Sequence, residues 1–536
     1  MPYRRLRAPS ENGATLVEPP WEQLDDLIAE NAARRGSVGR YDVQGCTLAA
    51  LSRRAREELL AAARRWTGSY RDLPTPPPSD GLVFLAGHQP QLFHPGVWYK
   101  NAVLDHLARQ HGAVAVNLLI DSDQVRTTSI RVPDGSRAEP AIATLALDRP
   151  EPHVPYEERA IVDAQQFCRF GESVLRTVSP WIPDALVADF WPLACRRASA
   201  TGNLGAALAQ ARHGWESRWS MATLEVPQSH LCEGQAFRWF VAHLLAHLPQ
   251  FHSIYNESVR EYRRLHRIRN AAHPVPELKA SEGWLEAPFW VWRSSEPHRR
   301  GLWARQRDRS IEISDRGALR ADLPLSPTVD AGVAVEQLTS LAGAGWKLRS
   351  RALTTTLFAR LFLGDVFIHG IGGAKYDQLA DVIGERFFAF RLPGHLVVSA
   401  TLLLPVPRLD VSVDDLRRID RQLRELTFQP ERHARAERGE ESRLAQRVAE
   451  KARWIATPPT RETARTRFRA IRRINAELQP FIAETRQSLL RERDEVLKRL
   501  RDNAVLSWRE YPFCVYPEAT LRQFLFDSLP QRAAVS

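Results

Sequence analysis

The chain has 536 residues, of which 44% are hydrophobic and 26% charged, a composition typical of a globular protein with two or three domains. No apolar run reaches about eighteen residues, so we expect no transmembrane helix, and the first residues lack the apolar stretch of a secretory signal. The five cysteines are scattered without a C-x-x-C pair. This argues against a disulfide framework or a zinc ribbon and favours a reduced, cytoplasmic protein.

The net charge is +11, and nearly all the basic residues are arginine. A basic balance can indicate a nucleic-acid partner. Here the arginines are interspersed with Asp and Glu, which favours solvated, salt-bridged surfaces instead. We therefore expect no nucleic-acid partner, although a modest positive field would suit a small ligand that carries phosphate.

The first 80 residues are predicted to form an N-terminal helical segment. Apolar residues at three- and four-residue spacing predict helices at 21–34 and 48–66. The run D-L-P-T-P-P-P-S-D at 72–80 is a Pro-rich connector that leads into the next segment.

A strand, a glycine-bearing loop, a helix and a second strand follow one another between residues 82 and 123. Leu82–Ala86 and Ala113–Ile120 are short apolar runs that predict buried strands, and Val97–Gln110 has helical spacing. The loop between them reads G-H-Q-P-Q-L-F-H-P-G, and Asp121 and Asp123 follow the second strand. This order predicts a βαβ unit of nucleotide-binding type, although neither G-x-G-x-x-G nor a P-loop is present.

The middle of the chain, up to residue 405, is predicted to continue this core with α+β insertions. A strand is expected at 126–133, helices at 163–178 and 234–247, and Trp-rich strands at 284–293 and 301–314.

A second glycine-bearing loop is predicted at residues 369–377, which read H-G-I-G-G-A-K-Y-D. It follows a helix at 352–363 and a short strand at 365–368, and we expect it to open a further helix. Backbone N–H groups of such a loop can bind an anion, to which Lys375 adds charge. The alternative is a tight turn that needs a positive φ at one of its glycines.

Residues 406–507 are dense in Arg, Glu and Leu and almost free of Gly, which predicts a helical hairpin or coiled-coil arm. The run T-P-P-T at 457–460 should divide it, and Pro480 should kink or break the second half. Phe468, Ile471, Leu478 and Ile482 are expected to form its apolar seam. The tail at 508–536 begins with an aromatic, strand-like pattern at 507–516 and is expected to dock on the core.

Several residues have two competing interpretations. His88 and His94 could stabilise phosphate charge in a transition state, or one could cap the helix or pack on Trp98. Lys100 could contact a phosphate or be solvated. Asp121 and Asp123 could bind ribose, Mg²⁺ or a substrate amine, or could cap the next turn. A metal held by His88, His94 and Asp121 lacks the expected ligand spacing, so no metal site is assigned.

The two loops in this order, followed by the charged helical region, resemble the BshC family, the cysteine-adding enzymes of bacillithiol biosynthesis. The likeness extends from about Val83 to the C-terminus. It is carried by Gln89, Gly96, Tyr99 and Lys100 in the first loop and by residues 351–376 around the second. The resemblance implies a Rossmann-like parallel-sheet core, a coiled coil, a bound nucleotide, and a reaction that joins cysteine to a glucosamine-malate acceptor.

The chain departs from the family at three places. Where the family has a dense acidic and His cluster, this chain has Asp121-Ser-Asp-Gln-Val. In the second loop, Ile371 and Gly373 stand where the family tends to have Pro and Glu, and His88 and His369 are this chain's own. These departures leave open a non-catalytic nucleotide-binding protein whose arm serves a partner or a homodimer.

Our expectation is an α/β ligase that uses ATP or ADP to join cysteine, or another amino acid, to a small sugar-acid acceptor in a cleft between the two loops. We expect catalytic roles for His88, His94, Asp121, Asp123 and His369. We expect nucleotide contacts from Gly87, Gln89, Gly96, Lys100, Arg351, Thr354, Gly370, Gly372, Gly373, Lys375 and Tyr376.

Overall fold

A computed structural model of the protein describes residues 6–75, 81–151, 153–436 and 439–530. It is a mixed α/β structure that divides into two compact units. Unit 1 contains the described residues of Met1–Val132, Ala143–Pro405 and Arg509–Ser536, and unit 2 those of Pro133–Ile142 and Val406–Trp508. Part of the predicted Pro-rich connector, residues 76–80, lies outside the described residues.

Unit 1 is built on a six-stranded sheet with the order β1-β16-β15-β4-β5-β8. The neighbours among the last five strands pair in parallel, and β1 pairs antiparallel with β16. The strands are β1 (Thr15–Glu18), β4 (Val83–His88), β5 (Val114–Leu119), β8 (Leu224–Pro227), β15 (Val366–His369) and β16 (His395–Ala400). The chain runs outward from β4 through β5 to β8 and returns to the other side of β4 for β15 and β16. The strand order therefore reverses between β4 and β15.

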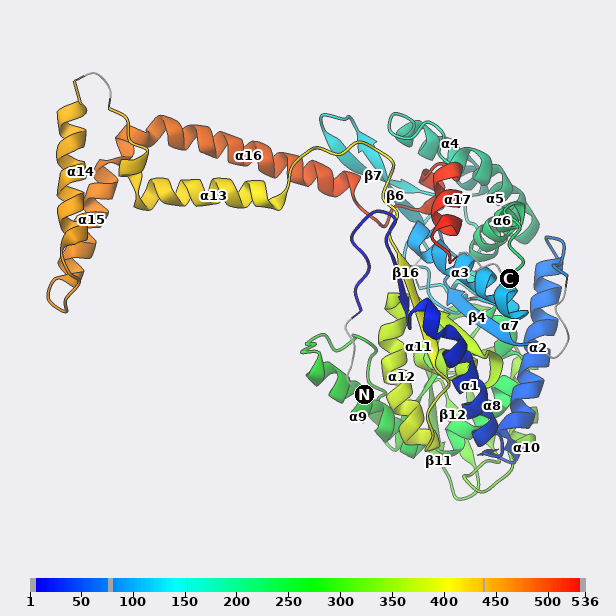
Figure 1. Ribbon diagram of the computed structural model, residues 1–536. Coiled ribbons are helices and arrows are strands. Elements are labelled where there is room, and N and C mark those ends of the chain that lie inside the picture. Colours follow the sequence, from blue (N-terminus) through cyan, green and yellow to red (C-terminus); the bar gives the residue numbers. More distant parts are fainter. Residues whose placement is uncertain (1–5, 76–80, 152, 437–438, 531–536) are drawn as a thin grey trace. The chain divides into compact units, whose positions relative to one another are not determined.

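Helices cover both faces of this sheet (Figure 1). Because side chains alternate along a strand, Val83 and Leu85 join the main core cluster, which also contains residues of α2 (Leu48–Gly68). Phe84 faces the other way, and its ring centroid lies 5.8 Å from that of His111 at the end of α3 (Pro95–His111). The continuous apolar run of β4 is thus explained by burial on two faces.

A second sheet in unit 1 is antiparallel, with the order β13-β12-β11-β10-β14, and β9 pairs with β10. Its strands are β9 (Ala280–Ser281), β10 (Trp284–Arg293), β11 (Glu296–Gln306), β12 (Ile311–Ser314), β13 (Arg320–Leu323) and β14 (Trp346–Ser350). The helices of the middle region are α4 (Ala164–Val178), α5 (Val187–Thr201), α6 (Leu204–Arg218), α7 (Gln228–Cys232), α8 (Gln235–Ala246), α9 (Leu248–Leu265) and α10 (Gly332–Gly343).

The predicted loop at 369–377 is wrong in its length. Strand β15 includes His369, and α12 (Ile371–Phe388) begins two residues later, so only Gly370 lies between them. Gly370 is the N-cap with an extended backbone, and none of the loop's three glycines has a positive φ. The glycines are tolerated because the first helical turn has no complete set of intrahelical hydrogen bonds to lose.

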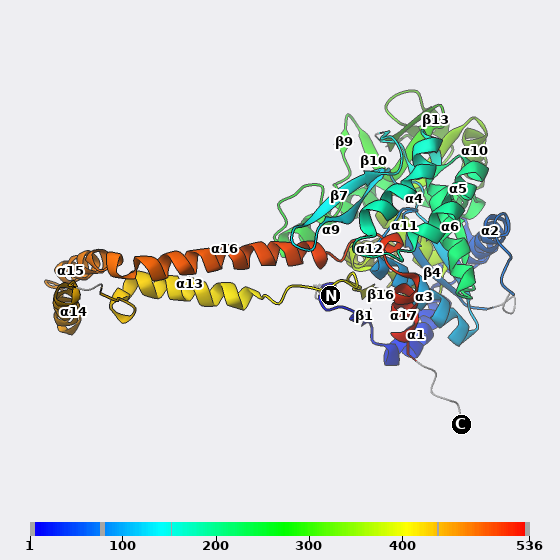
Figure 2. The same ribbon diagram turned by 90° about the horizontal axis from the view of Figure 1, so that it is seen from above.

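Unit 2 consists mainly of two antiparallel helix pairs, which Figures 1 and 2 show in two views. One pair is α13 (Val413–Phe428) with α16 (Ala483–Leu506), and the other is α14 (Glu441–Ala456) with α15 (Ala464–Glu477). The hairpin of β6 (Ser129–Gly135) and β7 (Pro140–Ala146) includes the boundary between the units. The break at 457–460 is confirmed between α14 and α15, and a 3₁₀ turn at Gln479–Ile482 separates α15 from α16 around Pro480.

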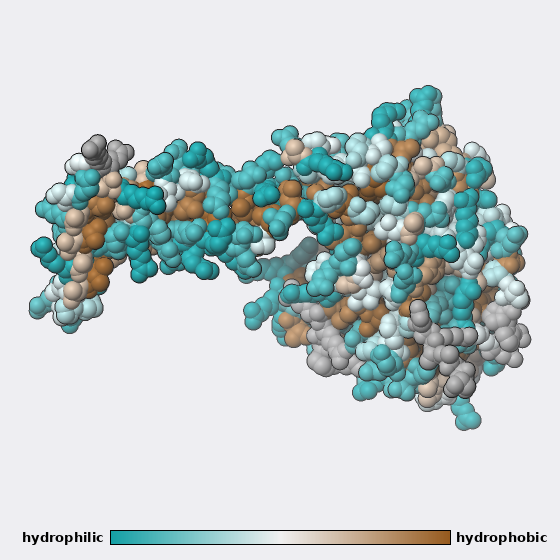
Figure 3. Space-filling model, turned by 45° about the horizontal axis from the view of Figure 1, so that its top comes forward, coloured by the Kyte–Doolittle hydropathy of each residue, from teal (hydrophilic) through white to brown (hydrophobic). Residues whose placement is uncertain are grey.

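The apolar seam of unit 2 is only partly buried. Leu478 and Ile482 are buried together with Ile474. Phe468, which the sequence places on the same seam, has 63% of its surface exposed. Figure 3 shows apolar side chains at the surface of the α14–α15 pair, among the hydrophilic side chains that dominate the unit.

The strand-like pattern predicted at 507–516 is wrong. This segment contains a 3₁₀ turn at Phe513–Val515 and is followed by α17 (Glu518–Asp527). Its aromatic side chains are buried because they pack on other aromatic rings: Phe513 lies 4.4 Å from Trp98 and 5.6 Å from Phe93 between ring centroids. A run of buried aromatic residues between two prolines has the composition of a strand, but its burial here comes from ring packing and not from strand pairing.

Candidate functional site

A cavity of about 530 Å³ lies beyond the carboxyl ends of β4 and β15. Because the strand order reverses between these two strands, their following segments separate and leave a crevice, the usual ligand site of open α/β sheets. The lining residues from the two predicted loops are Gly87, His88, Gln89, His94, Gly96, Lys100, His369, Gly370, Gly372, Gly373 and Tyr376. The expectation that two loops more than 250 residues apart meet at one cavity is therefore met.

Two helices begin at this cavity. Helix α3 has His94 as its N-cap and α12 has Gly370, and neither cap makes a side-chain hydrogen bond to the first turn. The first N–H groups of a helix have no intrahelical partner and carry the positive end of the helix dipole. Both helix starts therefore offer N–H donors to an anion in the cavity.

Two glycines allow the close packing that shapes the site. A Cβ atom at Gly96 would collide with the carbonyl oxygen of Ala400 in β16, so only glycine lets α3 begin there. A Cβ atom at Gly373 would lie 2.5 Å from Nδ1 of His369. A Cβ atom at Gly372 would meet no heavy atom within 4 Å, so this position faces open space.

Three imidazoles at the cavity are held neutral. Burial, followed by the charge of Lys100, lowers the pKa of His88 to about 3. Burial and Arg509 lower the pKa of His94 to about 4. Burial also lowers the pKa of His369, although Asp377 opposes this shift. Neutral imidazoles can accept or donate a hydrogen bond to a ligand without adding charge.

His369 belongs to a buried group that the sequence did not predict. Its Nε2 lies against the carboxylate of Asp377, and Nε2 of His395 lies 3.9 Å from the same carboxylate. Burial raises the pKa of Asp377, but His369, His395 and Arg360 outweigh this and lower it to about 2. An ionised Asp377 therefore fixes the ring of His369 against the cavity wall. Asp377 was overlooked because it lies two helical turns beyond Gly370, inside a predicted loop.

The second sheet contributes Trp290 and Arg299, which local sequence patterns could not identify, and the predicted Arg351 follows its strand β14. The guanidinium carbons of Arg351 and Arg299 lie 3.9 and 4.8 Å from the ring centroid of Trp290. Arg351 is also paired with Glu286 at 2.6 Å. Stacking on Trp290 orients both planar groups at the cavity, where they can bind carboxylate or phosphate. Only Arg351 was expected, because Trp290 and Arg299 join the site through sheet packing.

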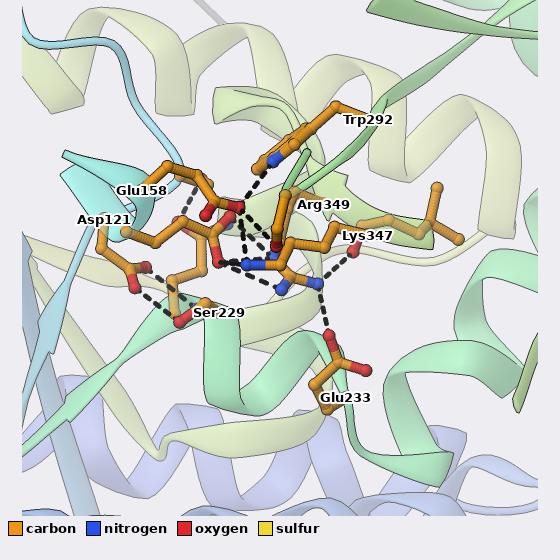
Figure 4. Close-up of polar contacts among 12 residues, drawn as sticks. Asp121, Glu158, Ser229, Glu233, Trp292, Lys347 and Arg349 are labelled. Atoms are coloured by element: carbon orange, nitrogen blue, oxygen red, sulfur yellow. Dashed lines mark hydrogen bonds and ion pairs between the residues drawn. The ribbon is translucent and has the colours of Figure 1, made fainter. Parts of the chain in front are cut away.

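The two aspartates after β5 face different surroundings. Asp123 lines the cavity, where it accepts hydrogen bonds from Gln89 at 3.0 Å and from Arg299 at 3.2 Å. Asp121 instead accepts hydrogen bonds from the backbone N–H and the hydroxyl of Ser229, and it lines a separate cavity (Figure 4). The structure thus brings Asp123 to the predicted site and directs Asp121 away from it.

Two other expected contacts also lie outside the cavity. Thr354 is fully buried and donates to the carbonyl oxygen of Pro288 at 2.9 Å. Lys375 is exposed on α12 and is not a lining residue. Arg509 and Glu510 from the tail do line the cavity, although no sequence motif marks them.

Among the described residues, no group of three or more His, Cys, Asp or Glu side chains is arranged to hold a metal ion. Within the same residues, no helix is both long and apolar enough to cross a bilayer. Comparison with protein-family models and with curated proteins finds no match for this chain.

Proposed function

We propose that this chain is a ligase, resembling the BshC family, that binds a nucleotide in the cavity and joins cysteine or another amino acid to a small sugar-acid acceptor. The observation that supports the proposal is the convergence of two strand ends and two helix starts, at His94–Gly96 and Gly370–Gly373, on one cavity. A Rossmann-like core, a coiled-coil arm, a homodimer and a cytoplasmic location belong to the same proposal.

The nucleotide phosphates would bind at the starts of α3 and α12, where free N–H groups and two helix dipoles favour an anion. Arg299 and Arg351, stacked on Trp290, would bind the acid group of the acceptor. His369, whose Nε2 faces Asp377, would accept a hydrogen bond through Nδ1 from the amine of the acceptor. The reaction would transfer the activated acyl group of the amino acid to an amine of the acceptor.

The second candidate is a nucleotide-binding protein without ligase activity. It is favoured by one observation, the orientation of Asp121 toward Ser229 and away from the cavity. Of the two aspartates that follow β5, only Asp123 lines the cavity. Its carboxylate already accepts hydrogen bonds from Gln89 and Arg299.

Substitution of Gly372 tests where the phosphates bind. Its missing Cβ faces open space, so Gly372→Asp should fold, and an acid in the first turn of α12 should stabilise the helix by about 0.3–1 kcal/mol. The same carboxylate would repel a phosphate at this helix start. We expect the affinity for ADP, measured by calorimetry, to fall roughly ten- to a hundredfold.

Gly372→Asn is the matched control, because it has nearly the same size without the charge, and it should keep most of the wild-type affinity. If all three proteins bind ADP and ATP equally well, the phosphates do not lie at α12. If the wild type binds neither nucleotide, the proposal of nucleotide binding is wrong.

A further inference from the structure

The chain uses lysine very sparingly. Of 74 basic Lys and Arg residues, only six are lysines, at positions 100, 279, 347, 375, 451 and 498. Lysine and arginine differ in their protonation when they are buried: a buried lysine can lose its proton near neutral pH, whereas a buried arginine cannot. A lysine retained in a buried site of an arginine-rich chain therefore suggests that its neutral form is used.

The other five lysines have ordinary surroundings. Three are paired with a carboxylate: Lys347 with Glu158, Lys451 with Glu431 and Lys498 with Asp502. Lys279 and Lys375 are exposed. Lys100 differs from all of them, because it is only 2% exposed and forms no ion pair with any carboxylate of the described residues.

The position of Lys100 directs its amine to the cavity. It lies in the second turn of α3, lines the cavity, and donates from Nζ to the carbonyl oxygen of Gly87 at the end of β4. The groups that interact electrostatically with Lys100 are His88 on β4, His369 on β15 and Arg212 on α6, none of which is an acid. The acids that line the same cavity are Asp123, which is paired with Arg299, and Glu510. Burial, and after it the charge of Arg212, lower the pKa of Lys100 to about 7.

We propose that Lys100 is the proton acceptor of the cavity, which takes a proton from the ammonium group of an amine substrate before that amine attacks an activated carboxyl carbon. This inference rests on the proposed ligase function. The N–H bond breaks and its proton moves to Nζ of Lys100. The nitrogen lone pair forms the new C–N bond, the C–O bond to phosphate breaks with its electron pair, and the departing phosphate takes the second proton that the nitrogen loses. The nucleoside triphosphate supplies that phosphate when it activates the carboxyl group.

The competing role for Lys100 is that of a phosphate ligand, and the two roles need opposite protonation states. A proton acceptor must be neutral before the reaction, whereas a phosphate ligand must be charged, so a bound phosphate would raise its pKa. The two roles can therefore be separated by titrating this one amine with and without nucleotide.

Nuclear magnetic resonance of protein labelled only in its lysine side chains gives this titration directly, since only six side chains contribute signals. The signal of Lys100 is the one that disappears in both Lys100→Arg and Lys100→Met, and Lys375 serves as the exposed control. We expect a midpoint near pH 7 for Lys100, about three pH units below the ordinary value for lysine. Saturating ADP should move the Lys100 midpoint by less than about one unit.

A Lys100 midpoint above pH 9 would overturn the proposal and leave nucleotide binding, measured separately by calorimetry, unaffected. A rise of about two units or more on adding ADP would also overturn it, while supporting the proposed nucleotide site. Absence of ADP and ATP binding in calorimetry would instead remove the proposed function on which the step depends.

Discussion

Two cavities lie at the carboxyl edge of the same sheet, on either side of the segment Asp121–Asp123, and their charges are arranged differently. In the cavity next to β5 and β8, Arg349 contacts both Glu157 at 3.1 Å and Glu233 at 2.8 Å, and Lys347 contacts Glu158 at 2.6 Å (Figure 4). In the cavity between β4 and β15, Lys100 has no such partner among the described residues.

We infer from this difference that a cluster of buried charges is not in itself evidence for a functional site. The charges of that cluster pair with one another: Glu157 raises the pKa of Arg349 against the effect of burial, whereas burial, opposed by Arg349, raises the pKa of Glu157 to about 7. They connect β14 to the segments around Glu157 and Glu233 and leave little for a ligand to gain. At the other cavity, the amine of Lys100 contacts a backbone carbonyl oxygen and no carboxylate of the described residues, and two helix starts keep N–H donors that a ligand can use.

The largest effect that this comparison predicts is on stability at the paired cavity. Arg349→Met would leave Glu157 buried without its main partner, which should lower the free energy of unfolding by about 3–5 kcal/mol in urea titrations. Arg316→Met, which removes an exposed pair with Glu282, should cost less than about 1 kcal/mol. Equal losses in the two variants would mean that the Arg349 cluster is not a structural element.

The next effect is a gain in the free energy of unfolding, and it concerns Lys100 in the cavity between β4 and β15. Lys100 has a folded-state pKa of about 7 and an unfolded value of about 10.4, so between these pH values the unfolded chain binds more protons. The wild type should therefore gain stability relative to Lys100→Met as the pH rises from 7 to 10, by at most about 1.4 kcal/mol per pH unit. Near pH 8 the variant should be the more stable protein by roughly 3 kcal/mol. A difference that does not change with pH would show that Lys100 is not desolvated.

A smaller effect distinguishes two neighbouring glycines at the start of α12. Gly373→Ala places a methyl group 2.5 Å from Nδ1 of His369, and moving that ring should cost about 1–3 kcal/mol of unfolding free energy. Gly372→Ala meets nothing within 4 Å and should instead stabilise the helix slightly, by less than about 0.5 kcal/mol, because it lies in the first turn. The same sign for both in thermal unfolding would contradict the packing of His369 against Gly373.

The smallest effect is expected at Lys375. Because its side chain is exposed and outside the cavity, Lys375→Ala should change stability by less than about 0.5 kcal/mol and leave ADP affinity unchanged in calorimetry. A tenfold loss of ADP affinity would instead show that Lys375 belongs to the nucleotide site, as the sequence predicted.

The sequence was informative wherever function depends on the ends of neighbouring strands. Because β4 and β15 are buried on both faces, their sequences are continuous apolar runs that predict strands. The Gly, His and Lys residues that follow these runs predict loops. Most residues predicted from those two loops therefore line the cavity. Helix α12 was misplaced because glycine disfavours helix interiors on average, whereas in a first turn its cost is small.

Sequence reasoning failed where the contacts come from other layers of the fold. Trp290 and Arg299 reach the cavity through the register of the second sheet, and Arg509 through the docking of the tail. The sequence also could not predict that Asp121 and Asp123 face different cavities, since they are only two residues apart in the chain. Ser229 at the start of α7 decides the direction of Asp121, and nothing near Asp121 in the sequence indicates it.

The most direct test of the account is a crystal structure of the protein with a non-hydrolysable ATP analogue. We expect phosphate groups against the backbone of Gly96 and of Ile371–Gly373, in the cavity that Lys100 lines. Phosphate groups bound beside Arg349 and Lys347 in the neighbouring cavity would contradict it, because the charges described there as satisfied would then be the ligand site.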